Sequence, residues 1–194
     1  MTTAVIHYNA GNIQSLCYAL ERLGQTPLLT KDPEVLMSAD KVIFPGVGEA
    51  SSTMKYLQDI GLDKVIPNLR QPVLGICLGM QLMCQHSEEN NTTGLGIFEV
   101  PVLKFPSTKN FKVPHMGWNT LNENKDWTEF VPDESYAYFV HSYYVPVNPQ
   151  TTIVTNHGID FSAAMRKDNF YAVQFHPEKS AQTGTSILER FLKI

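Results

Sequence analysis

The chain has 194 residues, of which 43% are hydrophobic and 18% charged, and its formal net charge is -4. This composition is typical of a single globular domain over residues 1–194, and the acidic balance without a long basic run argues against nucleic acid or an anionic membrane as a partner. No apolar stretch approaches the roughly 20 residues that span a bilayer, and the N-terminus lacks the segments of a signal peptide. We therefore expect a soluble, cytoplasmic protein.

The first half of the chain alternates short apolar runs with amphipathic segments. The apolar runs have the length of buried strands, and a turn cluster or a glycine loop follows them. The first amphipathic segment has a suitable N-cap in Asn12 and a suitable stop in Gly24. The expected strands are 3–8, 41–44 and 72–76, and the expected helices are 12–24, 50–61 and 78–85. This alternation predicts a parallel sheet that is covered on both faces.

The second half of the chain has a different character. Between residues 97 and 175, several short β-like runs are separated by Pro, Asn and Gly, which indicates antiparallel strands added to the parallel core. Residues 181–194 form an amphipathic helix at the end. The expected fold is therefore a three-layer α/β fold, with a mostly parallel central sheet, helices on both faces and added antiparallel strands.

Three cysteines occur in the chain, at positions 17, 77 and 84. An odd number without a pairing pattern does not predict a disulfide framework, and the histidines show no metal-ligand spacing, so we expect no metal site and no cofactor. Cys77 differs from the others because glycines flank it in the run Gly75-Ile76-Cys77-Leu78-Gly79, where a strand meets a helix. Cys17 and Cys84 lack such flanks and are expected to pack in the core.

The run around Cys77 has the form of a nucleophile elbow, G-x-C-x-G. Flanking glycines remove the Cβ atoms that would collide on a tight, strained turn. The positive N-terminus of the following helix favours a thiolate, and the N–H of Leu78 is placed to bind an oxyanion. The alternative interpretation is a small buried cysteine at a strand–helix junction.

A base for this nucleophile is expected near the end of the chain. An apolar strand ends at His176, and Glu178 lies two residues further on, so in an extended backbone both side chains project to the same side. Glu178 can then accept a hydrogen bond from one ring nitrogen of His176 and leave the other nitrogen facing Cys77. The alternative is an exposed histidine at the end of a strand.

A glycine loop at residues 45–48 supplies a third element. It follows a strand, so it belongs at the carboxyl edge of the sheet, and it can present the N–H of Val47 to an oxyanion. The loop lacks the Lys-Ser/Thr ending of a phosphate loop. A plain strand–helix turn is the alternative interpretation.

Together these motifs resemble the class I glutamine amidotransferases, whose fold is flavodoxin-like. The resemblance covers nearly the whole chain: "PGVG" at 45–48, "GICLGMQ" at 75–81, "HSYY" at 141–144 and "QFHPEKS" at 174–180. Within the class, "PHMGWN" at 114–119 and "GNIQS" at 11–15 resemble the glutaminase subunits of imidazole glycerol phosphate synthases.

The resemblance implies an activity and a partner. Cys77 would attack L-glutamine, with His176 as base, Glu178 orienting it, and the N–H groups of Val47 and Leu78 holding the oxyanion. The ammonia would pass to a separate (β/α)8 cyclase subunit, in a heterodimer that serves histidine biosynthesis. Another class I glutaminase, such as that of pyridoxal phosphate synthesis, and a non-catalytic subunit on the same fold are the competing hypotheses.

The resemblance also implies binding residues. Substrate contacts are expected from Gln81, which lies one helical turn after Cys77, and from four further residues: Gly48, Glu89, Ser142 and Tyr143. The surface facing the cyclase is expected to contain Asn12, His115, Trp118 and Lys179. Two of these positions have competing interpretations, since Glu89 also suits a solvated loop and Trp118 also suits the core.

Overall fold

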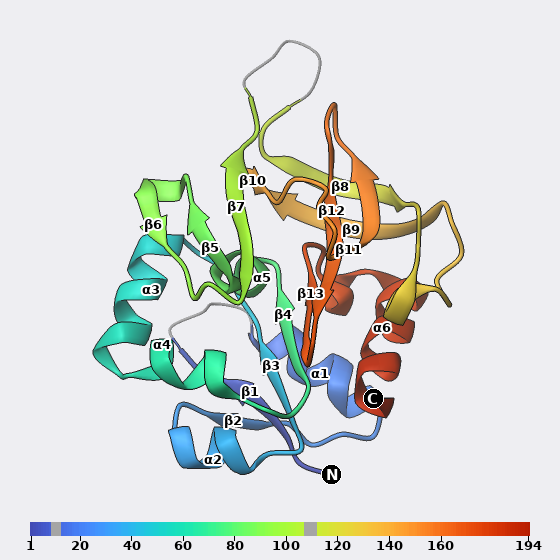
Figure 1. Ribbon diagram of the computed structural model, residues 1–194. Coiled ribbons are helices and arrows are strands. Elements are labelled where there is room, and N and C mark those ends of the chain that lie inside the picture. Colours follow the sequence, from blue (N-terminus) through green and yellow to red (C-terminus); the bar gives the residue numbers. More distant parts are fainter. Residues whose placement is uncertain (9–12, 107–111) are drawn as a thin grey trace.

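A seven-stranded sheet forms the centre of the computed structural model, which describes residues 1–8, 13–106 and 112–194. The strand order is β11-β12-β13-β4-β3-β1-β2. The five strands from β13 to β2 run parallel to one another, and β12 pairs antiparallel with both of its neighbours, β13 and β11. The expected fold class is confirmed (Figure 1). The strands are β1 (Thr3–Ile6), β2 (Leu28–Thr30), β3 (Lys41–Phe44), β4 (Val73–Ile76), β11 (Thr151–Asn156), β12 (Asp160–Lys167) and β13 (Phe170–Val173).

Helices cover both faces of this sheet (Figure 1). One apolar layer contains buried side chains of α2, α3, α4 and α5, and the other contains those of α1 and α6. Their bounds are α1 (Ile13–Arg22), α2 (Pro33–Ser38), α3 (Ala50–Asp59), α4 (Leu62–Val65), α5 (Leu78–Met83) and α6 (Ala181–Lys193). Short 3-10 helices are η1 (Ile66–Asn68), η2 (Glu89–Asn91), η3 (Asp126–Thr128) and η4 (Pro177–Lys179).

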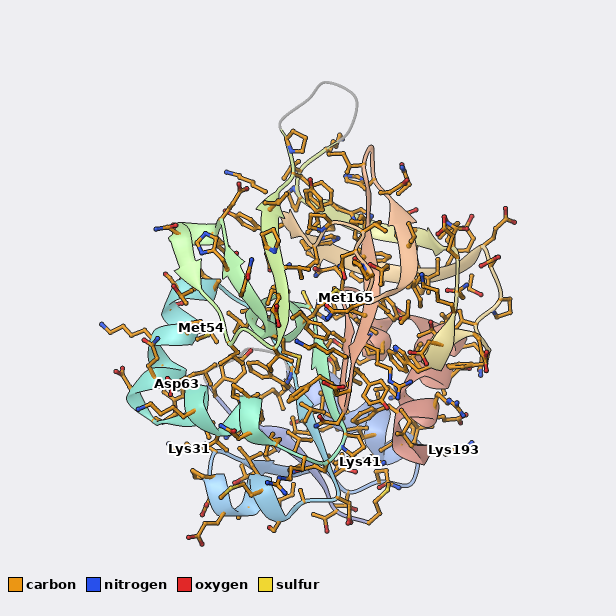
Figure 2. The ribbon with its side chains drawn as sticks, in the orientation of Figure 1. Lys31, Lys41, Met54, Asp63, Met165 and Lys193 are labelled. Carbon is orange, nitrogen blue, oxygen red and sulfur yellow. The ribbon has the colours of Figure 1, made fainter. Side chains whose placement is uncertain are left out.

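The central strands are apolar on both sides because both sides meet a helical layer. In β3, Val42 and Phe44 pack into one layer while Ile43 packs into the other. Figure 2 shows the same division between inside and outside, with Met54 and Met165 inside the molecule and charged ends such as that of Lys193 at its edge. The alternation therefore fixes which residue of each strand faces which layer.

Two smaller sheets lie together at the upper end of the molecule as drawn (Figure 1). One has four strands in the order β10-β7-β5-β6, and the other is an antiparallel ribbon of β8 and β9. Their strands are β5 (Cys84–Ser87), β6 (Thr92–Thr93), β7 (Phe98–Lys104), β8 (His115–Leu121), β9 (Ser135–His141) and β10 (Tyr143–Tyr144). Strands β7 to β10 lie in the region from 97 to 175 where additional strands are expected, whereas β5 and β6 precede it and are not among the expected strands.

Other elements also differ from the expected ones. Helix α5 ends at Met83, and Cys84 begins β5 instead of continuing the helix, because the chain turns there to pair with β7. Cys84 is nevertheless buried, as expected. Strand β2 and helix α2 are not among the expected elements, although Asp32 caps α2 and Pro33 opens it.

None of the helices in the described ranges is long and apolar enough to cross a membrane.

Helix α6 packs closely on the segment that precedes it, and one glycine permits this. A Cβ at Gly184 would overlap the backbone of Pro177, including its carbonyl oxygen. We expect Gly184→Ala to lower the free energy of unfolding by about 3 kcal/mol, since overpacking against backbone outweighs the gain of about 1 kcal/mol in helix propensity. Urea denaturation measures this effect. The exposed Gln182→Ala on the same helix serves as control, and an equal effect in both variants would contradict the prediction.

Candidate functional site

Cys77 lies on a strained turn between β4 and α5. Its backbone has φ 52° and ψ -109°, in the left-handed half of conformational space that side chains with a Cβ rarely adopt. Both flanking glycines are needed for this arrangement: a Cβ at Gly79 would overlap the carbonyl oxygen of Phe44, and one at Gly75 would lie 3.0 Å from the backbone nitrogen of Met80. The expected elbow is therefore present, and the buried cysteine interpretation does not account for its strain.

His176 and Glu178 form a buried pair at the same edge of the sheet. Nδ1 of His176 lies 2.8 Å from Oε1 of Glu178, as the sequence predicts. The backbone reason differs, because residues 177–179 form the 3-10 helix η4 and not an extended strand. Burial alone would lower the pKa of His176, but its interactions with Cys77 and Glu178 raise it to about 10. The imidazolium is thus stabilised between these two groups.

The second ring nitrogen of His176 is free for chemistry. Nε2 is buried and has no hydrogen-bond partner among the described residues, whereas Nδ1 is fixed by Glu178. Cys77 and His176 line the same cavity, so the thiol and this ring face one shared space. The candidate nucleophile, base and orienting carboxylate are therefore brought together from the end of β4, the segment after β13 and η4.

A cavity of about 440 Å³ opens beside Cys77. Residues that are far apart in the chain line it, and they include all the expected catalytic, oxyanion and substrate residues except Glu178. Glu178 does not line the cavity but contacts the ring of His176. The lining residues are Val47, Gly48, Cys77, Leu78, Gln81, Glu89, Pro114, Val140, His141, Ser142, Tyr143 and His176. This volume suits a small polar molecule the size of an amino acid.

Gln81 projects from α5 into a polar network beside the thiol. Its Nε2 donates to the carbonyl oxygen of Tyr143 at 3.0 Å and to Oε1 of Gln174 at 2.9 Å. Nε2 of Gln174 in turn donates to Sγ of Cys77 at 3.7 Å. Gln174 is not among the expected functional residues, although a fully buried glutamine in the apolar run "YAVQF" is a recognisable signal.

Glu89 also lines the cavity. Its Oε2 accepts a hydrogen bond from the N–H of Ala50 at 2.8 Å, and burial together with the charge of Glu49 raises its pKa. Glu49 itself caps α3: burial acts to raise its pKa, but hydrogen bonds from Ser51 and Ser52 outweigh this and lower it to about 2. The cavity wall therefore includes a carboxylate that is anchored to the start of α3.

The N–H of Leu78 is already engaged, in contrast to the expectation that it is free. It donates to the carbonyl oxygen of Gly46 at 3.3 Å. A Cβ at Gly46 would overlap the backbone of Gly79 and the side chain of Leu78, so the glycine loop packs directly on the start of α5. Because the C=O and N–H of one trans peptide point in opposite directions, the N–H of Val47 then points away from Leu78.

The expected partner residues occupy different environments. Asn12 lies outside the described residues. His115 is only 4% exposed, so its side chain is not on the surface; it packs against Phe139 within the molecule. Trp118 is 53% exposed, which decides against a core position, and Lys179 is exposed with its Nζ 5.9 Å from the ring centre of Tyr138.

The described part of the chain contains no group of three or more His, Cys, Asp or Glu side chains that could hold a metal ion.

Comparison with known proteins gives one consistent family. The model of the family "Glutamine amidotransferase class-I" matches residues 4–194. "Imidazole glycerol phosphate synthase subunit HisH" of Bacteroides thetaiotaomicron is 57% identical over the full length of both chains, and the protein of the same name from Yersinia pseudotuberculosis is 43% identical over the full length of both.

Solved structures share the fold at lower identity. A glutamine amidotransferase from Thermotoga maritima has a TM-score of 0.64 and 18% identity, covering 100% of this chain and 81% of its own. The glutaminase domain of Trypanosoma brucei CTPS, solved with bound acivicin, has a TM-score of 0.68 and 17% identity, covering 100% of this chain and 94% of its own.

The His176–Glu178 pair makes stability depend on pH. The pKa of His176 is about 10 in the folded protein and 6.5 for the free side chain. The folded state therefore binds more protons than the unfolded state between these values, so the stabilisation is complete below pH 6.5 and is lost as pH rises through about 10. We expect the free energy of unfolding of the unmodified protein to fall by on the order of 1–3 kcal/mol over this window, and that of Glu178→Gln to fall by less.

Chemical denaturation at a series of pH values measures this dependence. Glu99→Gln is the control, because it makes the same charge change at an exposed ion pair with Lys167. Parallel pH dependences of the unmodified protein and Glu178→Gln would contradict the prediction.

Proposed function

The chain belongs to the class I glutamine amidotransferase family, and on that premise we propose that it is the glutaminase subunit of an imidazole glycerol phosphate synthase. It hydrolyses glutamine to glutamate and ammonia, and the ammonia serves a cyclase that forms imidazole glycerol phosphate and an aminoimidazole carboxamide ribotide in histidine biosynthesis. The observation that carries the proposal is the buried pair of His176 and Glu178 beside the strained Cys77 at the cavity wall. Full-length relatives that are named as subunits of this synthase support it.

The proposed reaction begins at Cys77. Its thiolate attacks the side-chain amide carbon of glutamine, and the C–N bond breaks as the imidazolium of His176 gives its proton to the departing ammonia. Glu178 holds the ring and stabilises its cationic form through the contact at 2.8 Å. Water then attacks the thioester with His176 as base, which releases glutamate and restores the thiol.

The oxyanion of this reaction needs donors that the resting loop does not supply. The carbonyl of Gly46 occupies the N–H of Leu78. A turn of the Gly46–Val47 peptide removes that carbonyl and directs the N–H of Val47 to the same place, because both belong to one peptide plane. Gly48, with φ +116°, gives the loop the freedom to reorganise. We propose that Val47 and Leu78 act as oxyanion donors only after this turn.

The substrate's α-amino and α-carboxylate groups need partners across the cavity. We propose that Glu89 binds the ammonium, since it is the acidic side chain among the residues that line the cavity. Gln81 and the backbones of Gly48, Ser142 and Tyr143 then surround the rest of the molecule. The oriented amide of Gln81 favours this role because it is fixed by two hydrogen bonds before substrate arrives.

The partner is proposed to dock on an exposed aromatic surface, which we call the ribbon face: Met116, Trp118, Tyr136, Tyr138 and Lys179. Trp118 and Tyr138 are opposite each other in the ribbon, and their rings meet edge to face at 6.1 Å. Exposed aromatic residues with a basic neighbour are the composition of a protein interface. We propose that a (β/α)8 cyclase occupies it in a heterodimer, and that the complex assembles in the cytoplasm.

Substitution of the nucleophile tests the chemistry. We expect Cys77→Ala to lower glutamate release in the presence of the cyclase by at least about a thousandfold, since no other group can form the thioester. Cys17→Ala, at a buried cysteine on α1, is the control and should retain activity. Mass spectrometry after treatment with 6-diazo-5-oxo-norleucine should find the adduct on Cys77 in the unmodified protein. Retained glutamate release in Cys77→Ala would overturn the proposed function.

Titration with the cyclase tests the ribbon face. We expect the chain alone to release glutamate at least about a hundredfold more slowly than the saturated complex, since each missing oxyanion donor costs about a hundredfold or more. Trp118→Ala should raise the midpoint of the titration about tenfold or more without changing its plateau, since an exposed aromatic anchor is lost. Met37→Ala is the control, because Met37 is 58% exposed but lies on α2. An unchanged midpoint in Trp118→Ala would place the partner elsewhere.

A further inference from the structure

Three histidines gather at one part of the cavity wall, where His141 lines the cavity, and none has a part in the proposed chemistry. His115 and His141 are buried, and their rings pack with those of His157, Phe105 and Phe139. The ring of His115 stacks on that of His157 with centres 4.1 Å apart. Buried imidazoles that touch one another need a defined arrangement of protons, and the contacts of this cluster determine one.

The arrangement begins at the wall of the cavity. Nδ1 of His141 lies 2.7 Å from the carbonyl oxygen of Tyr143, which can only accept, so Nδ1 carries the hydrogen. Burial, supported by the nearby His115, His157 and His176, lowers the pKa of His141 to about 3, and the ring is neutral. Its Nε2 therefore has no hydrogen and can only accept.

The second histidine continues the same pattern. Nδ1 of His115 lies 2.8 Å from Nε2 of His141, so it must be the donor. Burial and the charge of His157 lower the pKa of His115 to about 4, which leaves its Nε2 as an acceptor for the amide of Asn119 at 3.2 Å. The same amide nitrogen of Asn119 also donates to the carbonyl oxygen of Asn156 at 2.8 Å. The three hydrogen bonds that connect Asn119, His115, His141 and Tyr143 are therefore all donated in the same direction, towards the carbonyl of Tyr143.

The carbonyl of Tyr143 connects this chain to the nucleophile. It accepts from His141 and also from Nε2 of Gln81. Gln81 contacts Gln174, and Gln174 contacts the thiol of Cys77. The histidines therefore fix the orientation of the Tyr143 carbonyl, and this carbonyl in turn fixes the amide of Gln81 in the cavity.

We propose that His141 and His115, as a pair of neutral Nδ1–H tautomers, are positioning residues that hold the Tyr143 carbonyl and through it orient Gln81 in the glutamine cavity. The inference rests on the proposed function for its substrate. It also gives β8 a second role: the strand that carries Trp118 on the ribbon face carries His115 on its inner face and Asn119 at the end of the hydrogen-bonded chain. A shift of this strand on docking would reach the cavity through the two imidazoles.

Two substitutions of His141 separate a positioning role from a packing role. The side-chain nitrogen of asparagine occupies the place of Nδ1, whereas that of glutamine reaches the place of Nε2. His141→Gln therefore loses the donation to Tyr143, and we expect the KM for glutamine of the complex with the cyclase to rise about three- to tenfold with a much smaller change in kcat. His141→Asn should recover most of that loss. His86→Gln, the same substitution outside the cluster, is the control.

Nitrogen NMR of the unmodified protein tests the tautomers without any variant. The imidazole nitrogen shifts of His141 and His115 should report hydrogen on Nδ1 and should not change between pH 5 and 8, since both pKa values are depressed to about 3 and 4. A hydrogen on Nε2 of either ring, or a titration in this range, would overturn the proposal even if the variants fail to fold.

The kinetic results distinguish the two levels of inference. An unmodified complex that releases no glutamate refutes the proposed function, and the positioning role in glutamine binding fails with it. An active complex whose KM is the same in His141→Gln refutes the positioning role alone. A KM that rises equally in His141→Gln and His141→Asn assigns His141 to packing and also refutes it.

Discussion

The close approach of α5 to the ends of β3 and β4 is the constraint on which the site depends. Gly79 lies against the carbonyl of Phe44, and Gly46 lies against the start of α5, with no room for a Cβ at either position. This contact holds Cys77 in its left-handed conformation and brings the loop at 45–48 within hydrogen-bonding distance of Leu78. Two strands and one helix therefore place both Cys77 and the peptide groups that we propose as oxyanion donors.

Most of the fold and of the site follows from the sequence, because the relevant signals are local. Apolar strands that alternate with helices predict the buried parallel sheet, and the paired glycines around Cys77 predict the elbow. The end of α5 at Met83 could not be predicted in this way, because pairing of β5 with β7 overrides the helical pattern. The engagement of Leu78 is likewise a tertiary contact, made by a carbonyl more than thirty residues away.

The polar interior of the site illustrates the limit of reading one sequence. Gln81 on α5 contacts Tyr143 on β10 and Gln174 directly after β13, and neither contact is visible in the spacing of the sequence. The expectation of a surface position for His115 is wrong although its neighbour Trp118 is exposed, because successive residues of β8 face opposite sides. Strand alternation applied to residues 115–118 could have corrected that expectation.

The hydrogen bond between Leu78 and Gly46 has a consequence for metabolism. If the oxyanion donors are assembled only when the cyclase is bound, a copy of this chain without its partner leaves the cellular glutamine pool almost untouched. The two subunits then need no exact balance in their synthesis, because surplus copies are idle and release no free ammonia. One backbone contact in a resting loop would thus protect a nitrogen donor that many other pathways share.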